Sequence, residues 1–416
     1  MFFLYNLLLG FYLLLIRFAA LFNTKAWLWV KGRENEFYVL KNKIKNDKPY
    51  VWFHCASMGE FEDGRNFIEL VRSHYPNYTI LITFFSPSGY EARKNYEHAD
   101  TICYLPYDFP YKVKRFLDIV NPRLVFFIRA DVWLNYLTEI KKREIPLFLV
   151  SLSMRKDSSF LKWPAITMYK KAFKCFTTVF VQDEQTASLA KEKLQLNNVK
   201  ITGNTRLDRV VAARESFKEM PLIEKFKGDS FCVITGSILK KDENIVLQVY
   251  EQLKHLPIKW IFVPHEIDNN AIATIIKKYP SEMVAYSQTE YLRPEHRGLW
   301  IDNVGMLAKL YYYVDVAYIG GGFNTMGIHN IAEPAVFGKP VAFGPNHRNY
   351  KEALDIIEIG GATIIDNVDE LMAFINKLYN NRGELVRIGE LNRQYIYSQA
   401  GGAIKILKLL QEEKVF

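Results

Sequence analysis

The chain has 416 residues, of which 49% are hydrophobic and 24% charged, and its formal net charge is +9. This length exceeds what one hydrophobic core usually organises, so we expect two domains. The four cysteines form no CxxC or Cys/His pattern, which argues against a structural zinc site and indicates a reducing, cytosolic setting. The basic residues match no nucleic-acid-binding motif, so we expect no nucleic-acid partner.

The first segment, residues 1–22, is almost wholly apolar and is interrupted by Asn6 and Arg17. A bilayer span needs roughly 20 such residues. A signal peptide fits poorly, because the positive charge follows the apolar run. We predict a membrane-anchoring or interfacial helix, with a buried core helix as the alternative. Basic side chains then hold the downstream chain on the cytoplasmic side: Lys25, Lys31, Arg33, Lys41, Lys43 and Lys45.

From about residue 49, apolar runs alternate with amphipathic stretches, which is typical of mostly parallel sheets covered by helices on both faces. The first series of predicted strands is 50–54, 79–84, 101–105, 124–128, 147–152 and 179–181. Predicted helices include 111–120 and 134–143, and the polar stretch 206–220 is the expected linker. A second series follows at 231–237, 260–263, 299–301, 316–319, 340–343 and 362–365.

This alternation predicts an α/β protein with two doubly wound, Rossmann-like domains facing each other across a cleft. The expected domains are 23–210 and 221–390, preceded by the anchor at 1–22 and followed by a closing helix within 391–416.

Glu60 stands directly after the first predicted strand, on a turn of small residues that opens a helix. Ligands of open α/β sheets gather at the carboxyl ends of strands. A carboxylate placed there can take a proton from a substrate hydroxyl. The alternative is that Glu60 only stabilises the helix N-terminus.

A strand of the second series ends at Gly320 and Gly321, where the backbone can approach a ligand closely. We expect a helix to begin near Asn330, and its free N–H groups would favour an anion such as phosphate. Glu333 in its first turn could accept two hydroxyls of a ribose. Because the spacing is not GxGxxG, a Gly-rich turn with a capped helix is the alternative to this predicted nucleotide site.

Two further loops end strands of the second series. His265, after Pro264, could reach a phosphate or a base, although such a histidine is more often a hydrogen-bonded structural residue. The backbone near Gly305 could read a base edge. No carboxylates cluster at metal-binding spacing, so we infer no bound divalent ion.

Six segments together resemble a known family, because they occur in the same order and at similar spacing. They are ASMGE at 56–60, LPYD at 105–108, DVWLN at 131–135, TGNTRLD at 202–208, PHE at 264–266 and HNIAEP at 329–334. With the N-terminal anchor, they resemble the 3-deoxy-D-manno-octulosonic acid (Kdo) transferases of lipid A assembly, which are GT-B glycosyltransferases using CMP-Kdo. The resemblance spans nearly the whole chain.

The resemblance implies an inverting transfer of Kdo from CMP-Kdo to a hydroxyl of a lipid A precursor (a lipid IVA-type acceptor) in lipopolysaccharide core assembly. It makes Glu60 the general base and gives Asp131 and Arg206 supporting roles at the transition state. It implies no cofactor or metal, and a location at the cytoplasmic face of the inner membrane. The residues it assigns to CMP binding are Pro264, His265, Val304, Gly305, Met306, Gly320, Gly321, Asn330, Ile331, Ala332 and Glu333.

The chain departs from the family pattern at a few positions. Arg129 and Asp131 stand where the family often has two glutamates, Met306 stands where Glu is common, and Ile238 and Leu239 replace a commoner segment. The alternatives are another GT-B enzyme that uses a UDP-sugar for cell-envelope glycosylation, and a non-catalytic, membrane-tethered nucleotide-binding protein.

Overall fold

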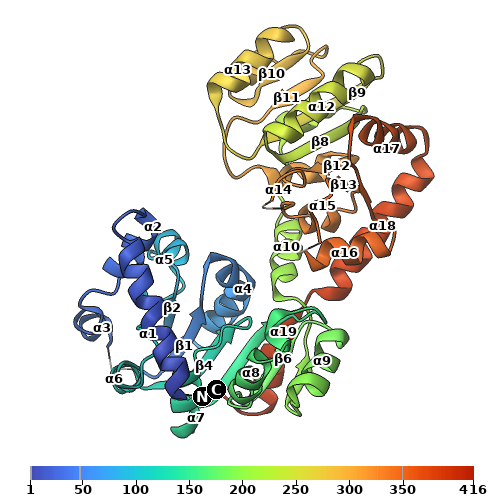
Figure 1. Cartoon of the computed structure of the whole chain (residues 1–416). Helices are drawn as coiled ribbons and strands as arrows, with labels where there is room; N and C mark the ends of the chain where they lie inside the picture. The colour runs from blue at the N-terminus through green and yellow to red at the C-terminus, as the bar shows by residue number, and fades with distance from the viewer. Residues whose placement is uncertain (1, 46–47, 326, 349) are drawn as a thin grey trace. The chain divides into compact units, whose positions relative to one another are not determined.

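The chain folds into two compact units in the computed structural model, which describes residues 2–45, 48–325, 327–348 and 350–416. Unit 1 comprises the chain up to residue 208 together with 399–416, and unit 2 comprises residues 209–398. Each unit contains a seven-stranded parallel sheet between helices (Figure 1). The predicted pair of doubly wound α/β folds is confirmed. Met1, the first residue of the predicted anchor, lies outside the described residues.

Unit 1 has the strand order β3-β2-β1-β4-β5-β6-β7. Its strands are β1 (Tyr50–Cys55), β2 (Thr79–Phe84), β3 (Thr101–Tyr104), β4 (Pro122–Ile128), β5 (Leu147–Leu152), β6 (Thr178–Val181) and β7 (Val199–Ile201). Its helices are α1 (Phe2–Ala19), α2 (Thr24–Lys31), α3 (Glu36–Lys43), α4 (Met58–His74), α5 (Pro87–Arg93), α6 (Pro110–Val120), α7 (Leu134–Lys142), η1 (Ser159–Leu161), α8 (Ala165–Phe173), α9 (Glu184–Leu194) and α19 (Gly402–Glu412).

The two faces of this sheet are covered by different helices, because side chains alternate along each strand. Val51 and Phe53 of β1 pack with residues of α4 and α19. Trp52, between them, points to the other face and packs with residues of α6, α7, α8 and α9. All three side chains are fully buried. Such two-sided burial produces the continuous apolar runs from which the strands were predicted.

Unit 2 has the strand order β10-β11-β9-β8-β12-β13-β14. Its strands are β8 (Phe231–Ile238), β9 (Ile258–Pro264), β10 (Met283–Ala285), β11 (Gly298–Trp300), β12 (Val316–Ile319), β13 (Val341–Phe343) and β14 (Ala362–Ile364). Its helices are α11 (Pro221–Lys227), α12 (Lys240–Leu253), α13 (Asn269–Lys278), η2 (Tyr286–Tyr291), α14 (Leu307–Leu310), η3 (Tyr311–Tyr313), α15 (Ala332–Val336), α16 (Lys351–Glu358), α17 (Val368–Asn380) and α18 (Arg382–Gln399). The helix α10 (Thr205–Glu215) begins in unit 1 and continues into unit 2.

The N-terminal helix α1 contacts the rest of unit 1 along a narrow stripe of its surface. Leu9 and Leu13 are buried against Trp29 and Tyr107. Most other apolar side chains of α1 are exposed, and only 6% of the 18-residue window of the helix is buried. The alternative of a buried core helix is therefore wrong. Among the described residues, α1 is the one helix long and apolar enough to cross a membrane, by length and composition only.

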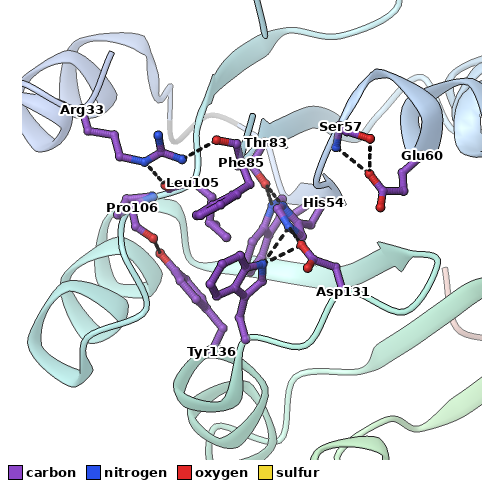
Figure 2. A network of polar contacts seen from close by, with 12 residues as sticks. Arg33, His54, Ser57, Glu60, Thr83, Phe85, Leu105, Pro106, Asp131 and Tyr136 are labelled. Carbon is purple, nitrogen blue, oxygen red and sulfur yellow. Dashed lines mark hydrogen bonds and ion pairs between the residues drawn. The ribbon is translucent and has the colours of Figure 1, made fainter. Parts of the chain in front are cut away.

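Arg33 behaves differently from the basic flank with which it was grouped. Its side chain is buried and donates hydrogen bonds to the carbonyl oxygens of Leu105 (2.9 Å) and Phe85 (2.7 Å), as Figure 2 shows. Burial lowers the pKa of Arg33 to about 10. The guanidinium thus joins the segment after α2 to the carboxyl ends of β2 and β3, and it is not available to a membrane surface.

Candidate active site

The strand order of unit 1 reverses between β1 and β4, so that β2 and β3 lie on one side and β5 to β7 on the other. In open α/β sheets, ligands bind in the crevice outside the carboxyl ends of the strands at such a switch point. The loop after β1 carries Glu60, and the loop after β4 carries Asp131. Glu60, the expected general base, and Asp131, the expected supporting carboxylate, therefore stand on the two loops of the unit 1 switch point.

Glu60 lies in the first turn of α4 and is half-buried. Its Oε2 atom accepts hydrogen bonds from the backbone N–H and the hydroxyl of Ser57, both at 2.6 Å (Figure 2). Burial raises the pKa of Glu60; the Ser57 hydroxyl opposes this, Asp131 adds to it, and His54 opposes it. Glu60 thus forms a capping box, as the structural alternative predicts, while its Oε1 atom accepts no hydrogen bond from the described residues.

Asp131 is held by two donors on the same oxygen. His54 Nε2 lies 2.8 Å and Trp133 Nε1 lies 2.6 Å from Asp131 Oδ2. The other ring nitrogen of His54, Nδ1, lies 2.8 Å from Thr83 Oγ1, which also accepts a hydrogen bond from Trp52 Nε1. If the hydroxyl of Thr83 donates to Nδ1, His54 carries its proton on Nε2 and donates it to Asp131. The network fixes the carboxyl group of Asp131 in one orientation.

Sequence reasoning did not find His54, Thr83 or Trp133 as partners of Asp131. His54 is fully buried within β1, so it reads as part of an apolar strand. A signal was nevertheless present: a histidine inside a strand buried on both faces needs a polar partner. Thr83 lies directly opposite His54 on β2 and supplies it.

Two arginines near this edge differ in their availability. Arg129 has a positive φ of 65°, and its Nε donates to Asp63 Oδ2 at 2.5 Å. Arg206 is half-buried in the first turn of α10, and its guanidinium makes no hydrogen bond or ion pair within the described part of the chain. The adjacent Thr205 hydroxyl donates to the backbone oxygen of Asp63 in α4. Arg206 is therefore the cation that remains open to an external anion, whereas Arg129 already has a carboxylate partner.

The strand order of unit 2 reverses between β8 and β12, and the predicted glycines stand on this switch point. A Cβ on Gly320 would lie 2.4 Å from the backbone oxygen of Ser237, so the residue that follows β12 touches the end of β8 and must be glycine. Gly321 has a φ of 93°, and its N–H donates to Asp242 Oδ2 at 3.0 Å. The glycines thus allow other groups to come close to the backbone, but Ser237 and Asp242 of the same chain already take part of this space.

A histidine pair adjoins these glycines. The rings of His265, after Pro264, and His329 stack with centroids 4.4 Å apart. His329 Nε2 is buried without a hydrogen-bond partner in the described residues, and it would lie 3.2 Å from a Cβ on Gly321. Burial, followed by His265, lowers the pKa of His329. His329 therefore contacts both His265 and Gly321. It was not among the site residues predicted from the sequence.

The helix expected to begin near Asn330 is short and begins two residues later. It is α15, which begins at Ala332 and has five residues. The side chain of Asn330 accepts the N–H of Ala332 at 3.2 Å and donates to Glu333 Oε1 at 2.9 Å. The proposed anion site at this N-terminus is thus partly filled by the chain's own groups. Ile331, directly before Ala332, is buried and contributes its backbone only.

The loop after β11 contains both exposed and buried residues. Val304 is 86% exposed, Gly305 has a φ of 85°, and Met306 is buried. The next residue, Leu307, would lie 3.1 Å from a Cβ on Gly236 at the end of β8. The loop therefore reaches the same edge of the unit 2 sheet as the glycines. No group of three or more His, Cys, Asp or Glu side chains in the described ranges could hold a metal ion.

Comparisons with known proteins agree on one family. The profile described as 3-deoxy-D-manno-octulosonic-acid transferase (kdotransferase) matches residues 32–209. The 3-deoxy-D-manno-octulosonic acid transferase of Haemophilus influenzae is 26% identical over 372 residues, covering 87% of this chain and 86% of that protein. The enzyme of the same name from Chlamydia trachomatis serovar A is 26% identical over 396 residues, covering 91% and 86%.

Among solved structures, UDP-GlcNAc 2-epimerase from Neisseria meningitidis bound to UDP-GlcNAc has a similar fold. It superposes with a TM-score of 0.60 at 15% identity, over 88% of this chain and all of that one. This likeness shows the GT-B type of fold with its two doubly wound units. With the profile match and the relatives that span most of its length, the chain belongs to the Kdo transferase family of glycosyltransferases.

Proposed function

We propose that the chain transfers Kdo from CMP-Kdo to a hydroxyl of a lipid A precursor with inversion at the anomeric carbon, and that Glu60 is the general base. The observation that carries this proposal is the placement of Glu60 and Asp131 on the two switch-point loops of unit 1 in a member of this family. Glu60 has one oxygen fixed by Ser57 and the other open to a substrate hydroxyl.

In a single displacement, the acceptor oxygen attacks the anomeric carbon as the bond to the CMP phosphate breaks. Glu60 Oε1 takes the acceptor proton, and the raised pKa of the Glu60 carboxyl brings it closer to the operating pH, which suits a base. Such help is typically worth about 10²–10⁴-fold in rate.

Asp131 and Arg206 have supporting roles in this proposal. The sugar becomes oxocarbenium-like as the leaving group departs, as in glycoside hydrolysis. The carboxyl group of Asp131, oriented by His54 and Trp133, would stabilise that positive charge. Arg206, which has no partner within the described residues, would stabilise the negative charge of the phosphate or of the Kdo carboxylate.

We assign donor binding to unit 2. His265 and His329 can donate to the phosphate near Gly320 and Gly321, and Glu333 can accept ribose hydroxyls. The remaining assigned contacts are those of Pro264, the loop of Val304, Gly305 and Met306, and the run of Asn330, Ile331 and Ala332. These groups need no divalent metal to meet the single phosphate of CMP-Kdo.

We place the enzyme at the cytoplasmic face of the inner membrane, where its lipid acceptor lies. The exposed apolar side chains of α1 fit a hydrocarbon interface. Lysines of the following segment, such as the exposed Lys25, Lys31 and Lys41, are attracted to anionic headgroups by about 1 kcal/mol each near the surface.

The test is the substitution Glu60→Gln. Glutamine keeps a side-chain oxygen that can accept the Ser57 N–H, so the cap is preserved while the base is lost. We expect transfer to fall by about 10²–10⁴-fold, measured by mass spectrometry of the product from CMP-Kdo and a lipid A precursor. Exposed Glu97→Gln in the same unit is the control.

Binding of CMP to the Glu60→Gln variant, measured by calorimetry, should stay within about twofold of the parent, because Glu60 is not among the groups assigned to CMP. Transfer that survives within a few-fold would show that Glu60 is only a cap. A thermal shift with UDP-sugars and none with CMP-Kdo would contradict the donor assignment.

A further inference from the structure

The segment from Arg155 to Lys174, which follows β5, is the most strongly basic part of unit 1 outside the N-terminal region. It contains six basic residues and one acidic residue, Asp157. The acidic residue pairs with Arg155. The basic residues are Arg155, Lys156, Lys162, Lys170, Lys171 and Lys174. Such a run attracts an anionic surface, because the one acidic residue of the segment offsets only one of its six positive charges.

Trp163 stands in the middle of this segment with 83% of its surface exposed. Lys162 before it and Pro164 after it are also exposed. A tryptophan presents a large apolar ring with one polar N–H group, and the residue is enriched where proteins meet the boundary between water and lipid. One exposed tryptophan alone would need no explanation. An exposed tryptophan within a lysine-rich segment has the composition of an interfacial contact.

The segment is a fixed part of unit 1. Phe160 stacks on Tyr169, with ring centroids 4.9 Å apart, and Phe173 of α8 is fully buried in the core. At its far end, Lys171 Nζ lies 4.3 Å from the ring of Phe2 in α1. The basic segment therefore adjoins the N-terminal end of the helix whose apolar side chains are exposed.

We propose that residues 155–174 form a second membrane contact of unit 1, in which the lysines bind the anionic headgroups of a bilayer and Trp163 enters the interface. The proposal rests on the proposed function only for the choice of a bilayer as partner. Charge complementarity with anionic lipids and continuity with α1 through Phe2 support this occupant.

A second membrane contact would fix the orientation of unit 1 relative to the bilayer. The segment leaves the sheet at the carboxyl end of β5, beside β4, whose following loop carries Asp131. One helix alone would leave unit 1 free to rotate about its attachment. Contacts through both α1 and the 155–174 segment would fix the orientation of this sheet edge to the lipid surface.

The experiment measures binding of the full chain to vesicles of phosphatidylcholine, with or without 30% phosphatidylglycerol and without acceptor. We expect Lys156→Gln with Lys162→Gln to weaken binding to the anionic vesicles about tenfold or more, and to change binding to neutral vesicles little. The control is Lys405→Gln with Lys408→Gln on α19, because α19 packs on the opposite face of the same sheet and both lysines are exposed.

A second measurement follows the tryptophan directly. Lipids brominated near the headgroup should quench less of the fluorescence of Trp163→Phe than of the parent chain, and Trp163→Ala should weaken binding several-fold to both vesicles. Equal vesicle affinity of the lysine variant and its α19 control would overturn the proposal. So would a loss that occurs only when acceptor is present, because the lysines would then recognise the acceptor.

Transfer to a micellar acceptor in detergent separates this proposal from the enzymatic one. The lysine and tryptophan variants should retain transfer within about twofold there, since none of these side chains has a proposed role in the reaction. Loss of transfer in micelles by these variants would contradict the membrane role, whereas inactivity of the parent chain would contradict only the proposed function.

Discussion

At the scale of single residues, the proposed catalytic site contains two carboxylates, Glu60 and Asp131, with different surroundings. Glu60 has one oxygen held by Ser57 and the other open. Asp131 has one oxygen held by His54 and Trp133. Two carboxyl groups with different surroundings can divide catalytic roles. The raised pKa of the Glu60 carboxyl suits it to take a proton, and the two donors on Asp131 fix the orientation of that carboxyl group.

The substitution Asp131→Asn tests this division. The negative charge of Asp131 contributes to the raised pKa of Glu60, so its removal lowers the pKa of the Glu60 carboxyl. A base must be ionised to act, and we therefore expect the acidic limb of the kcat/KM profile to move to lower pH, with a lower plateau. Product formation between pH 4 and 8 measures both effects. If the acidic limb stays in place, the group whose ionisation limits the rate at low pH is not Glu60.

Some residues of the proposed site could be predicted from the sequence, but their hydrogen-bond partners could not. Glu60 could be selected because its position after an apolar strand is local information. The hydrogen bond from His54 to Asp131 could not be predicted, since the two residues lie 77 positions apart in the chain. The contact between His54 and Thr83 could not be predicted either, because it joins two different strands. The ion pair of Arg129 was equally out of reach, because its partner Asp63 lies 66 positions away in the chain. Hydrogen bonds across a sheet depend on strand order, which a pattern of apolar residues does not specify.

At the scale of elements, most strands were predicted, including three of only three residues, and two short strands were missed. The strands of both series lie within two residues of their expected ends, because a strand buried on both faces must be apolar throughout. The three-residue strands β7 and β10 were not predicted. The helix expected to begin near Asn330 begins at Ala332 and has five residues, too few to show helical periodicity in the sequence.

The start of α7 is stabilised by a distant carboxylate. Asp108, after β3, accepts the backbone N–H groups of Asn135 (3.0 Å) and Tyr136 (2.9 Å) and the hydroxyl of Tyr5 in α1 (2.7 Å). It therefore joins α1 to the helix that follows the Asp131 loop. Burial raises the pKa of Asp108 to about 7, although its three hydrogen bonds oppose the rise.

The pH dependence of stability tests Asp108. Its folded pKa lies above its unfolded value, so its stabilising contribution is fully present below about pH 4 and is lost as the pH rises through about 7. Asp108→Asn removes this titration. We expect the unfolding free energy of the parent minus that of the variant to fall between about pH 4 and 7, measured by urea unfolding at several pH values. A difference that is constant with pH would contradict the assignment.

At the scale of the whole molecule, the chain passes from one unit to the other twice. After unit 2, residues 399–416 complete unit 1, and α19 packs with α4 against the sheet. The sequence predicted a closing helix at this end but not the unit to which it belongs. Asp208 accepts the backbone N–H groups of Gly401 (2.5 Å), Gly402 (3.1 Å) and Ala403 (2.7 Å), so the two ends of unit 1 are joined by hydrogen bonds.

Asp208→Ala should therefore destabilise unit 1 selectively. The substitution leaves three N–H groups at the start of α19 without their acceptor, two of them on buried residues, at an expected cost of about 2 kcal/mol. In calorimetry, we expect the unfolding transition of unit 1 to move to lower temperature while that of unit 2 stays in place. Asp229→Ala, at an exposed position in unit 2, is the control. Equal shifts of both transitions would argue against a local role.

The return of the chain to unit 1 also sets the order of events on the ribosome. The strands that carry Glu60 and Asp131 emerge first, but α19 is made only after all of unit 2. Until then, the face of the first sheet that includes Phe53 and Phe126 lacks one of its covering helices. The nascent chain thus holds an incomplete apolar face throughout the synthesis of about 190 residues, which would make unit 1 the part most dependent on chaperones.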